Sequence, residues 1–165
     1  SANFNADGFI KPDKINMISD GKFSESLTSP RSSLEYSVPH NASSIAEYPY
    51  SIDMNAGSVS DDSILSTINN GLYISNLWYL NFSDRNNGRM TGLTRFGCFI
   101  IENGKLTAPI NTMRFDDSVY SMLGDNLIGF TSKRELLIDS GTYEERSTSS
   151  ARLPGALVNN FKMTL

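Results

Sequence analysis

The stretch that decides the fold class is residues 71–115, "GLYISNLWYLNFSDRNNGRMTGLTRFGCFIIENGKLTAPINTMRF". Its three segments "LYISNLWYLNFS", "GRMTGLTRFGCFIIE" and "KLTAPINTMRF" are rich in the β-branched and aromatic residues that favour strands. Asp84–Gly88 separates the first two segments and Asn103-Gly104 the last two, and both sequences are typical of hairpin turns. The sequence therefore predicts a β-meander of three antiparallel strands.

Three short helices are expected around this meander. Ser29 is suited to the N-cap position and Pro30 to the first helical position of "SPRSSLEY". Ser60 is suited to the N-cap position of a second helix, "SDDSILSTINNG". Asp116 and Asp117 are expected to begin a third helix, "DDSVYSMLGDNLIGF", because acidic residues stabilise a helix start.

The rest of the chain predicts short strands and one irregular connection. Asp20-Gly21 favours a tight hairpin, and "RELLIDSG" and "GALVNNFKMTL" are strand candidates. Residues 38–50, "VPHNASSIAEYPY", have no periodicity. We therefore expect an α+β fold, with a mostly antiparallel β-sheet and two or three short helices, in a single domain over residues 1–165. The abrupt start "SANFNADGFI" suggests a fragment of a longer protein.

The composition indicates which kinds of partner and which cellular compartment to expect. The net charge is -4 and no Lys/Arg cluster occurs, so direct binding to nucleic acid is not expected. No apolar run approaches the roughly 20 residues of a membrane span, so no membrane partner is expected either. One cysteine and no signal peptide indicate a cytoplasmic setting.

The chain offers few groups for catalysis. A zinc hydrolase needs about three protein ligands, whereas this chain has one histidine, His40, and one cysteine, Cys98. We expect Cys98 to pack within a strand, and we predict no catalytic and no metal-binding residue. Asp84, Arg89 and Arg95 are polar residues within or beside apolar strands and are candidates for substrate binding, with simple solvent-facing alternation as the alternative.

Several ordered motifs resemble a known family. They are Gly71-Leu72-Tyr73, "TGLTR" at 91–95, "IENGK" at 101–105 and "LPGALV" at 153–158. "DGFIKPDKINMISDGKF" and "TSPRSSLEYSVPHNAS" follow the same pattern nearer the start. Together they resemble the C-terminal domain of the TldD/PmbA family, also called TldD/TldE or modulators of DNA gyrase, over nearly the whole chain.

This resemblance implies a role in peptide processing. The family works as dimers, and its TldD-type subunit is a metallopeptidase that acts on unfolded peptides. Its metal site combines a His-Glu-x-x-x-His helix, upstream of the region seen here, with a cysteine shortly before the chain end. At that second place this chain has "TYEERSTSSARLPG", without cysteine, and Cys98 lies too early to replace it. The chain is therefore closer to the metal-free, PmbA/TldE-like branch.

The leading interpretation is a PmbA/TldE-like subunit that forms part of a dimer and of a peptide chamber. Its partner would be a TldD-like subunit or a second copy, and its substrates would be unfolded peptides. Zinc would come only from residues or a partner outside this chain, and the isolated chain would be inactive. One alternative is a non-enzymatic interaction module that acts on gyrase. A complete metallopeptidase would need ligands from upstream residues.

Overall fold

The computed structural model describes residues 2–143 and 146–164 and divides the chain into two compact units. The first unit comprises Ser1–Met54 and Leu136–Arg152, and the second comprises Asn55–Glu135 and Leu153–Leu165. Strands β10 (Leu127–Ile138) and β11 (Ser150–Val158) contribute residues to both units. No helix of the described residues is long and apolar enough to cross a membrane.

The first unit contains the predicted hairpin. Strands β1 (Ile18–Ser19) and β2 (Lys22–Phe23) pair antiparallel about Asp20 and Gly21. Both turn residues have positive φ, 50° and 74°, as a two-residue turn of this kind requires. The hairpin prediction is confirmed, with strands of two residues each.

Helix α1 (Pro30–Tyr36) begins where its sequence predicts. The Ser29 hydroxyl accepts a hydrogen bond from the Ser32 N–H at 3.1 Å, and Pro30 occupies the first turn. The irregular segment 38–50 supports this helix start, because the Glu47 carboxylate accepts a hydrogen bond from the Ser29 N–H at 2.8 Å. That bond is the main reason why the pKa of Glu47 is lowered. The segment then leads into the short strand β3 (Ser51–Asp53).

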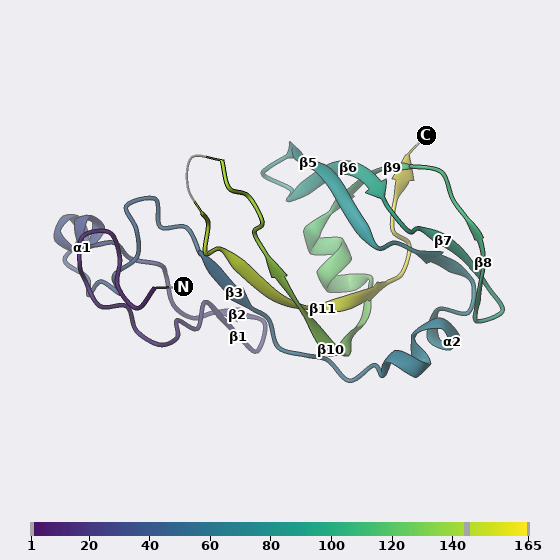
Figure 1. Ribbon diagram of the computed structural model, residues 1–165, viewed down its shortest axis with the longest axis horizontal. Helices are drawn as coiled ribbons and strands as arrows, with labels where there is room; N and C mark the ends of the chain where they lie inside the picture. The colour runs from purple at the N-terminus through teal and green to yellow at the C-terminus, as the bar shows by residue number, and fades with distance from the viewer. Residues whose placement is uncertain (1, 144–145, 165) are drawn as a thin grey trace. The chain divides into compact units, whose positions relative to one another are not determined.

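The second unit holds most of the strands (Figure 1). Besides its parts of β10 and β11, this unit contains η1 (Asp61–Ser63), α2 (Ile64–Ile68), β4 (Gly71–Tyr73), β5 (Asn76–Asp84), β6 (Arg89–Arg95), β7 (Phe99–Glu102), β8 (Lys105–Pro109), β9 (Arg114–Ser118), η2 (Ser121–Asp125) and β12 (Met163–Thr164). One sheet has the order β12-β9-β6-β5, a second β4-β7-β8 and a third β10-β11-β3. Antiparallel pairing dominates, with β11 and β3 parallel, so the predicted α+β class is confirmed.

The predicted meander exists, but each of its three strands breaks in two. The two halves of each predicted strand belong to different sheets: β5, β6 and β9 lie in one sheet, and β4, β7 and β8 form the other. The break between β6 and β7 falls at Phe96, whose φ of 63° is incompatible with an extended strand. Because paired strands must bend together, the three breaks lie across the ladder and turn one expected sheet into two.

The prediction that Asp116 and Asp117 begin a helix is wrong. Both residues lie in strand β9, which pairs with β6, and pairing and burial there outweigh the local preference of acidic residues for a helix start. Helical turns are confined to the residues just before and within η2, where Gly124 departs from helical geometry. Strand β10 then begins at Leu127, inside the segment predicted as helix. Helix α2 also ends earlier than predicted, at Asn69 with a φ of 58°.

The core of the second unit is small. Its buried apolar residues include Phe115, Ile101, Leu157 and Cys98, and the Phe115 ring centroid lies 5.1 Å from that of Phe161. Cys98 is 3% exposed, as expected of a packing residue, but it lies in the turn between β6 and β7 rather than in a strand. This placement follows from the break in the strand at Phe96.

Candidate functional site

Strand β5 is the outer strand of the four-stranded sheet. Among the described residues it pairs only with β6, and every residue from Asn76 to Ser83 is exposed. Its large side chains on the surface are Leu77, Trp78, Tyr79, Leu80 and Phe82. An outer strand presents a row of unpaired backbone N–H and C=O groups, to which another strand can add. We call Asn76–Asp84 the β5 edge.

A β-bulge shapes the middle of the β5 edge. Tyr79 and Leu80 together lie opposite the single residue Gly92 of β6, and Tyr79 has a φ of 57°. Left-handed backbone is rare for a bulky residue and costs of order 1–3 kcal/mol. Tyr79 is nevertheless 72% exposed, so burial of its ring does not compensate this strain.

Gly92 allows the bulge to lie close to the neighbouring strand. A Cβ at this position would stand 2.8 Å from Leu80 Cδ2, 2.8 Å from Phe115 Cε1 and 2.9 Å from the Trp78 carbonyl oxygen. The conformation of the β5 edge therefore depends on a glycine in the next strand.

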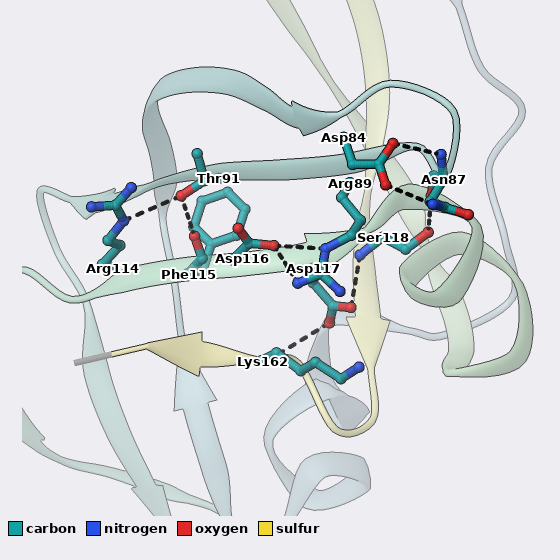
Figure 2. A network of polar contacts seen from close by, with 10 residues as sticks. All are labelled: Asp84, Asn87, Arg89, Thr91, Arg114, Phe115, Asp116, Asp117, Ser118 and Lys162. Carbon is teal, nitrogen blue, oxygen red and sulfur yellow. Dashed lines mark hydrogen bonds and ion pairs between the residues drawn. The ribbon is translucent and has the colours of Figure 1, made fainter.

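At the C-terminal end of β5, Asp84 closes the hairpin turn (Figure 2). One carboxylate oxygen accepts the Asn86 N–H at 3.0 Å, and the other accepts the Asn87 side-chain amide at 2.6 Å. The Asn87 amide is the largest of the causes that lower the pKa of Asp84. These bonds give Asp84 a structural role in the turn.

Arg89 is the cross-strand neighbour of Asp84 and forms an ion pair with Asp116. Its Nη2 and Nε donate to one Asp116 carboxylate oxygen at 2.6 and 3.1 Å. The Arg89 hydrogen bond is the main cause of the lowered pKa of Asp116. Figure 2 shows this pair between strands β6 and β9.

Next to this pair, Asp117 is 1% exposed, and each of its carboxylate oxygens accepts a backbone N–H. Its carboxylate accepts the Ser118 N–H at 2.8 Å and the Lys162 N–H at 3.1 Å (Figure 2). The second bond attaches the segment before β12 to β9. The carboxylates at this end of the sheet thus already have hydrogen-bond partners within the protein.

Arg95 lies at the opposite end of β6, beside the start of β5. Its guanidinium carbon stands 4.4 Å from the Trp78 ring centroid and 5.1 Å from that of Phe96, within the range of cation–π contact. Its carbonyl oxygen accepts hydrogen bonds from the Ser75 hydroxyl at 3.0 Å and from the Cys98 thiol at 3.4 Å. We call Trp78, Arg95 and Phe96 the stacked-arginine cluster.

The structure thus brings Asp84 and Arg89 together and places Arg95 apart from them. Sequence reasoning missed Asp116 and Asp117, because it assigned them to a helix. It also missed Trp78 and Phe96 as partners of Arg95. Their approach depends on strand register and on the turn at Phe96, neither of which has a local sequence signal.

Metal-ligating side chains are scattered. Within 2–143 and 146–164 no group of three or more His, Cys, Asp or Glu side chains is placed to hold a metal ion. His40, in the first unit, accepts the Ala42 N–H through Nδ1 at 3.2 Å and contacts the Phe9 ring edge-on. Both contacts fit a structural role.

Four residues of the segment 142–155, where the resemblance expects a cysteine, line a hollow of about 370 Å³ in the first unit. Residues that line it are Tyr50, Asp139, Gly141, Tyr143, Arg146, Ser147 and Thr148. Hydrogen bonds, chiefly from the Gly141 N–H, lower the pKa of Asp139. Glu144 and Glu145 of this segment lie outside the described residues.

Comparison with known proteins shows which family has this domain. The model of a family described as "PmbA/TldA metallopeptidase C-terminal domain" matches residues 1–165. No curated protein sequence matches the chain closely enough to count as a relative.

Solved structures share the fold at low sequence identity. TldE from Thermococcus kodakarensis superposes with a TM-score of 0.77 at 15% identity, over 99% of this chain and 36% of its own length. A candidate modulator of a DNA gyrase from Thermotoga maritima gives 0.77 at 12% identity, over 99% and 36%. One from Bacteroides thetaiotaomicron gives 0.69 at 17%, over 99% and 33%. The chain therefore spans about a third of the length of these proteins.

Proposed function

We propose that this chain, which belongs to the PmbA/TldD metallopeptidase family, is the C-terminal domain of a PmbA/TldE-like subunit in a peptide-processing complex. In this role it forms part of a dimer, with a TldD-like subunit or a second copy, and part of a chamber for unfolded peptides. It works in the cytoplasm and supplies no metal ligand of its own.

The observation that carries this proposal is the β5 edge. An unfolded peptide has free backbone groups, and pairing with an outer strand satisfies them without demanding a particular sequence. The exposed apolar side chains of β5 add contacts for side chains on both faces of such a peptide. A subunit with this edge can hold a substrate for chemistry performed elsewhere in the complex.

The absence of cysteine from residues 142–155 supports a role without metal. The resemblance implies that this position supplies a metal ligand in the TldD-type subunit. We expect the untagged protein to retain far less than one zinc or other transition metal ion per chain after mild chelation, as measured by elemental analysis. About one tightly held ion per chain would contradict this part of the proposal.

The alternative is an interaction module without any role in proteolysis. Two of the structural neighbours are described as candidate gyrase modulators, and exposed apolar strands suit protein partners as well as peptides. This alternative predicts tight binding to gyrase subunits and no affinity for unfolded peptides.

The proposal is tested by co-purification with a TldD-type subunit and by hydrolysis of an unfolded polypeptide by the complex. Tyr79→Lys places a charge on the β5 edge, which we expect to weaken strand addition and to raise KM several-fold. Tyr36→Lys, on the exposed face of α1, is the matched control, since Tyr36 is 68% exposed and Tyr79 is 72% exposed. Equal KM values for both variants and the wild type would contradict a role of β5 in substrate binding.

A further inference from the structure

The stacked-arginine cluster carries a positive charge to the start of the β5 edge. Arg95 lies opposite Asn76 in the register, and Leu93 lies opposite Trp78. Residues two apart share a face of a sheet, so Arg95 and Trp78 project from the same face. The arginine side chain therefore extends from the inner strand β6 over the ring of the outer strand β5.

Stacking leaves the hydrogen-bonding side of the guanidinium free. A guanidinium that lies over aromatic rings keeps its N–H groups in a plane that can bind a carboxylate through two parallel bonds. Arg89 has such a partner in Asp116, whereas no described residue offers Arg95 a carboxylate. The exposed Trp78 and Phe96 rings, 52% and 72% accessible, hold the charge at the surface.

Two bulky residues at this place have strained backbone. Phe96 and Tyr79 both have left-handed backbone, with φ of 63° and 57°, and both rings are exposed. Bulky residues in this conformation cluster at ligand-binding positions, where the surrounding structure holds them. Phe96 contacts the Arg95 guanidinium, and Tyr79 lies in the middle of the β5 edge.

We infer that Arg95, stacked between Trp78 and Phe96, binds a carboxylate at the C-terminal end of an extended peptide that lies antiparallel to β5. This inference rests on the proposed function, in which β5 pairs with an unfolded peptide. It adds the direction of the peptide and the group that anchors it.

The direction follows from where the unpaired charge lies. β5 runs from Asn76, beside Arg95, to Asp84. A peptide whose carboxylate is at Arg95 must therefore run the opposite way. At the Asp84 end the charges are already engaged with Asn87 and within the Arg89–Asp116 pair. The nine residues of β5 span roughly 26 Å, enough for a paired segment of about eight residues.

A carboxylate could come from the peptide's C-terminus or from an acidic side chain near it. Three fluorescein-labelled peptides of one unfolded sequence separate these sources: a free acid, a C-terminal amide, and an amide that ends in Glu. Binding to the protein is measured by fluorescence anisotropy. We expect the free acid to bind about tenfold more tightly than the plain amide, since a charge-assisted contact contributes roughly that much. Tight binding of the Glu-amide as well assigns the site to carboxylates in general.

Arg95→Gln should remove this difference and bring the free acid to the affinity of the amide. Arg95→Lys, which keeps the charge but loses the planar fork, should retain part of the preference. Arg85→Gln is the matched control, because Arg85 lies 5.8 Å from the Phe82 ring at the other end of β5. We expect it to leave the preference unchanged. Circular dichroism spectra and melting curves that match the wild type confirm that the variants fold.

Three outcomes would overturn the inference in different ways. If wild-type protein binds acid and amide equally, and Tyr79→Lys still weakens both, the β5 edge binds peptides but Arg95 does not bind their carboxylate. If no peptide binds, the proposed function fails as well. A photocrosslinking residue near the peptide's C-terminus should label Asn76–Trp78 or Phe96. Labelling of Phe82–Arg85 instead would show a parallel peptide and would also overturn the inference.

Discussion

Replacing Gly92 by alanine tests whether the bulge of β5 depends on its neighbour. The new Cβ would stand 2.8–2.9 Å from three groups: the Leu80 side chain, the buried Phe115 ring and the Trp78 carbonyl oxygen. Leu80 can rotate away, but Phe115 lies in the core and the carbonyl belongs to the backbone. The substitution must therefore move β5 or the core.

The magnitude follows from two opposing effects. Forcing a methyl group into a filled site costs about 1–3 kcal/mol. Alanine also restricts the unfolded chain relative to glycine, which offsets about 0.4–1 kcal/mol. We expect Gly92→Ala to lower the free energy of unfolding by about 1–2 kcal/mol. Gly97→Ala in the adjacent turn is the control, because its Cβ would meet only the Phe99 ring, at 3.3 Å. It should change stability by no more than about 0.5 kcal/mol.

Urea unfolding followed by the fluorescence of Trp78 measures both variants, since this tryptophan lies in β5 and its carbonyl is one of the groups displaced. The emission of folded Gly92→Ala should also shift, because the ring moves with the bulge. An unchanged unfolding midpoint for Gly92→Ala, or an equal loss for Gly97→Ala, would refute the steric account. Weakened peptide binding by Gly92→Ala would connect the bulge to the proposed function.

Three further measurements address the surrounding contacts. Cys98→Ala should cost about 1 kcal/mol through lost burial, and a bulky thiol reagent should label native Cys98 slowly; rapid labelling would contradict its burial. Asp117→Ala should cost about 2–3 kcal/mol, because two backbone N–H groups lose their acceptor, and a cost near zero would contradict the hydrogen-bonding account. Asp116, whose pKa is lowered chiefly by the Arg89 hydrogen bond, stabilises the folded state above the ordinary carboxyl pKa of about 4, and this contribution is lost as the pH falls through the lowered value. Arg89→Gln should flatten that part of the acid-unfolding curve, and an unchanged curve would contradict it.

Local signals predicted the elements that local interactions determine. The Asp20-Gly21 hairpin, the Ser29 cap with Pro30, and the Asn103-Gly104 turn all occur where the sequence indicates them. Each depends on residues within four positions of one another. The α+β class follows from the same signals, because strand-forming segments and short capped helices are distributed along the whole chain.

Features set by distant contacts were not predictable from local pattern. Asp116 and Asp117 suit a helix start by composition, yet pairing of β9 with β6 and the hydrogen bond from Lys162 place them in a strand. The same holds at the candidate site, where the sequence identified Arg95 but not its neighbours. The position of a polar residue within an apolar strand made Arg95 a candidate, but only the register places it over Trp78.

The break that divides the meander also builds the stacked-arginine cluster. A continuous strand through Phe96 would project its ring to the opposite face from Arg95, because neighbouring residues in a strand point to opposite sides. The left-handed turn at Phe96 brings the ring to 5.1 Å from the Arg95 guanidinium. Cys98, buried within the same turn, donates its thiol S–H to the Arg95 carbonyl oxygen. The cysteine thus contributes to the proposed binding surface through packing rather than through its own chemistry.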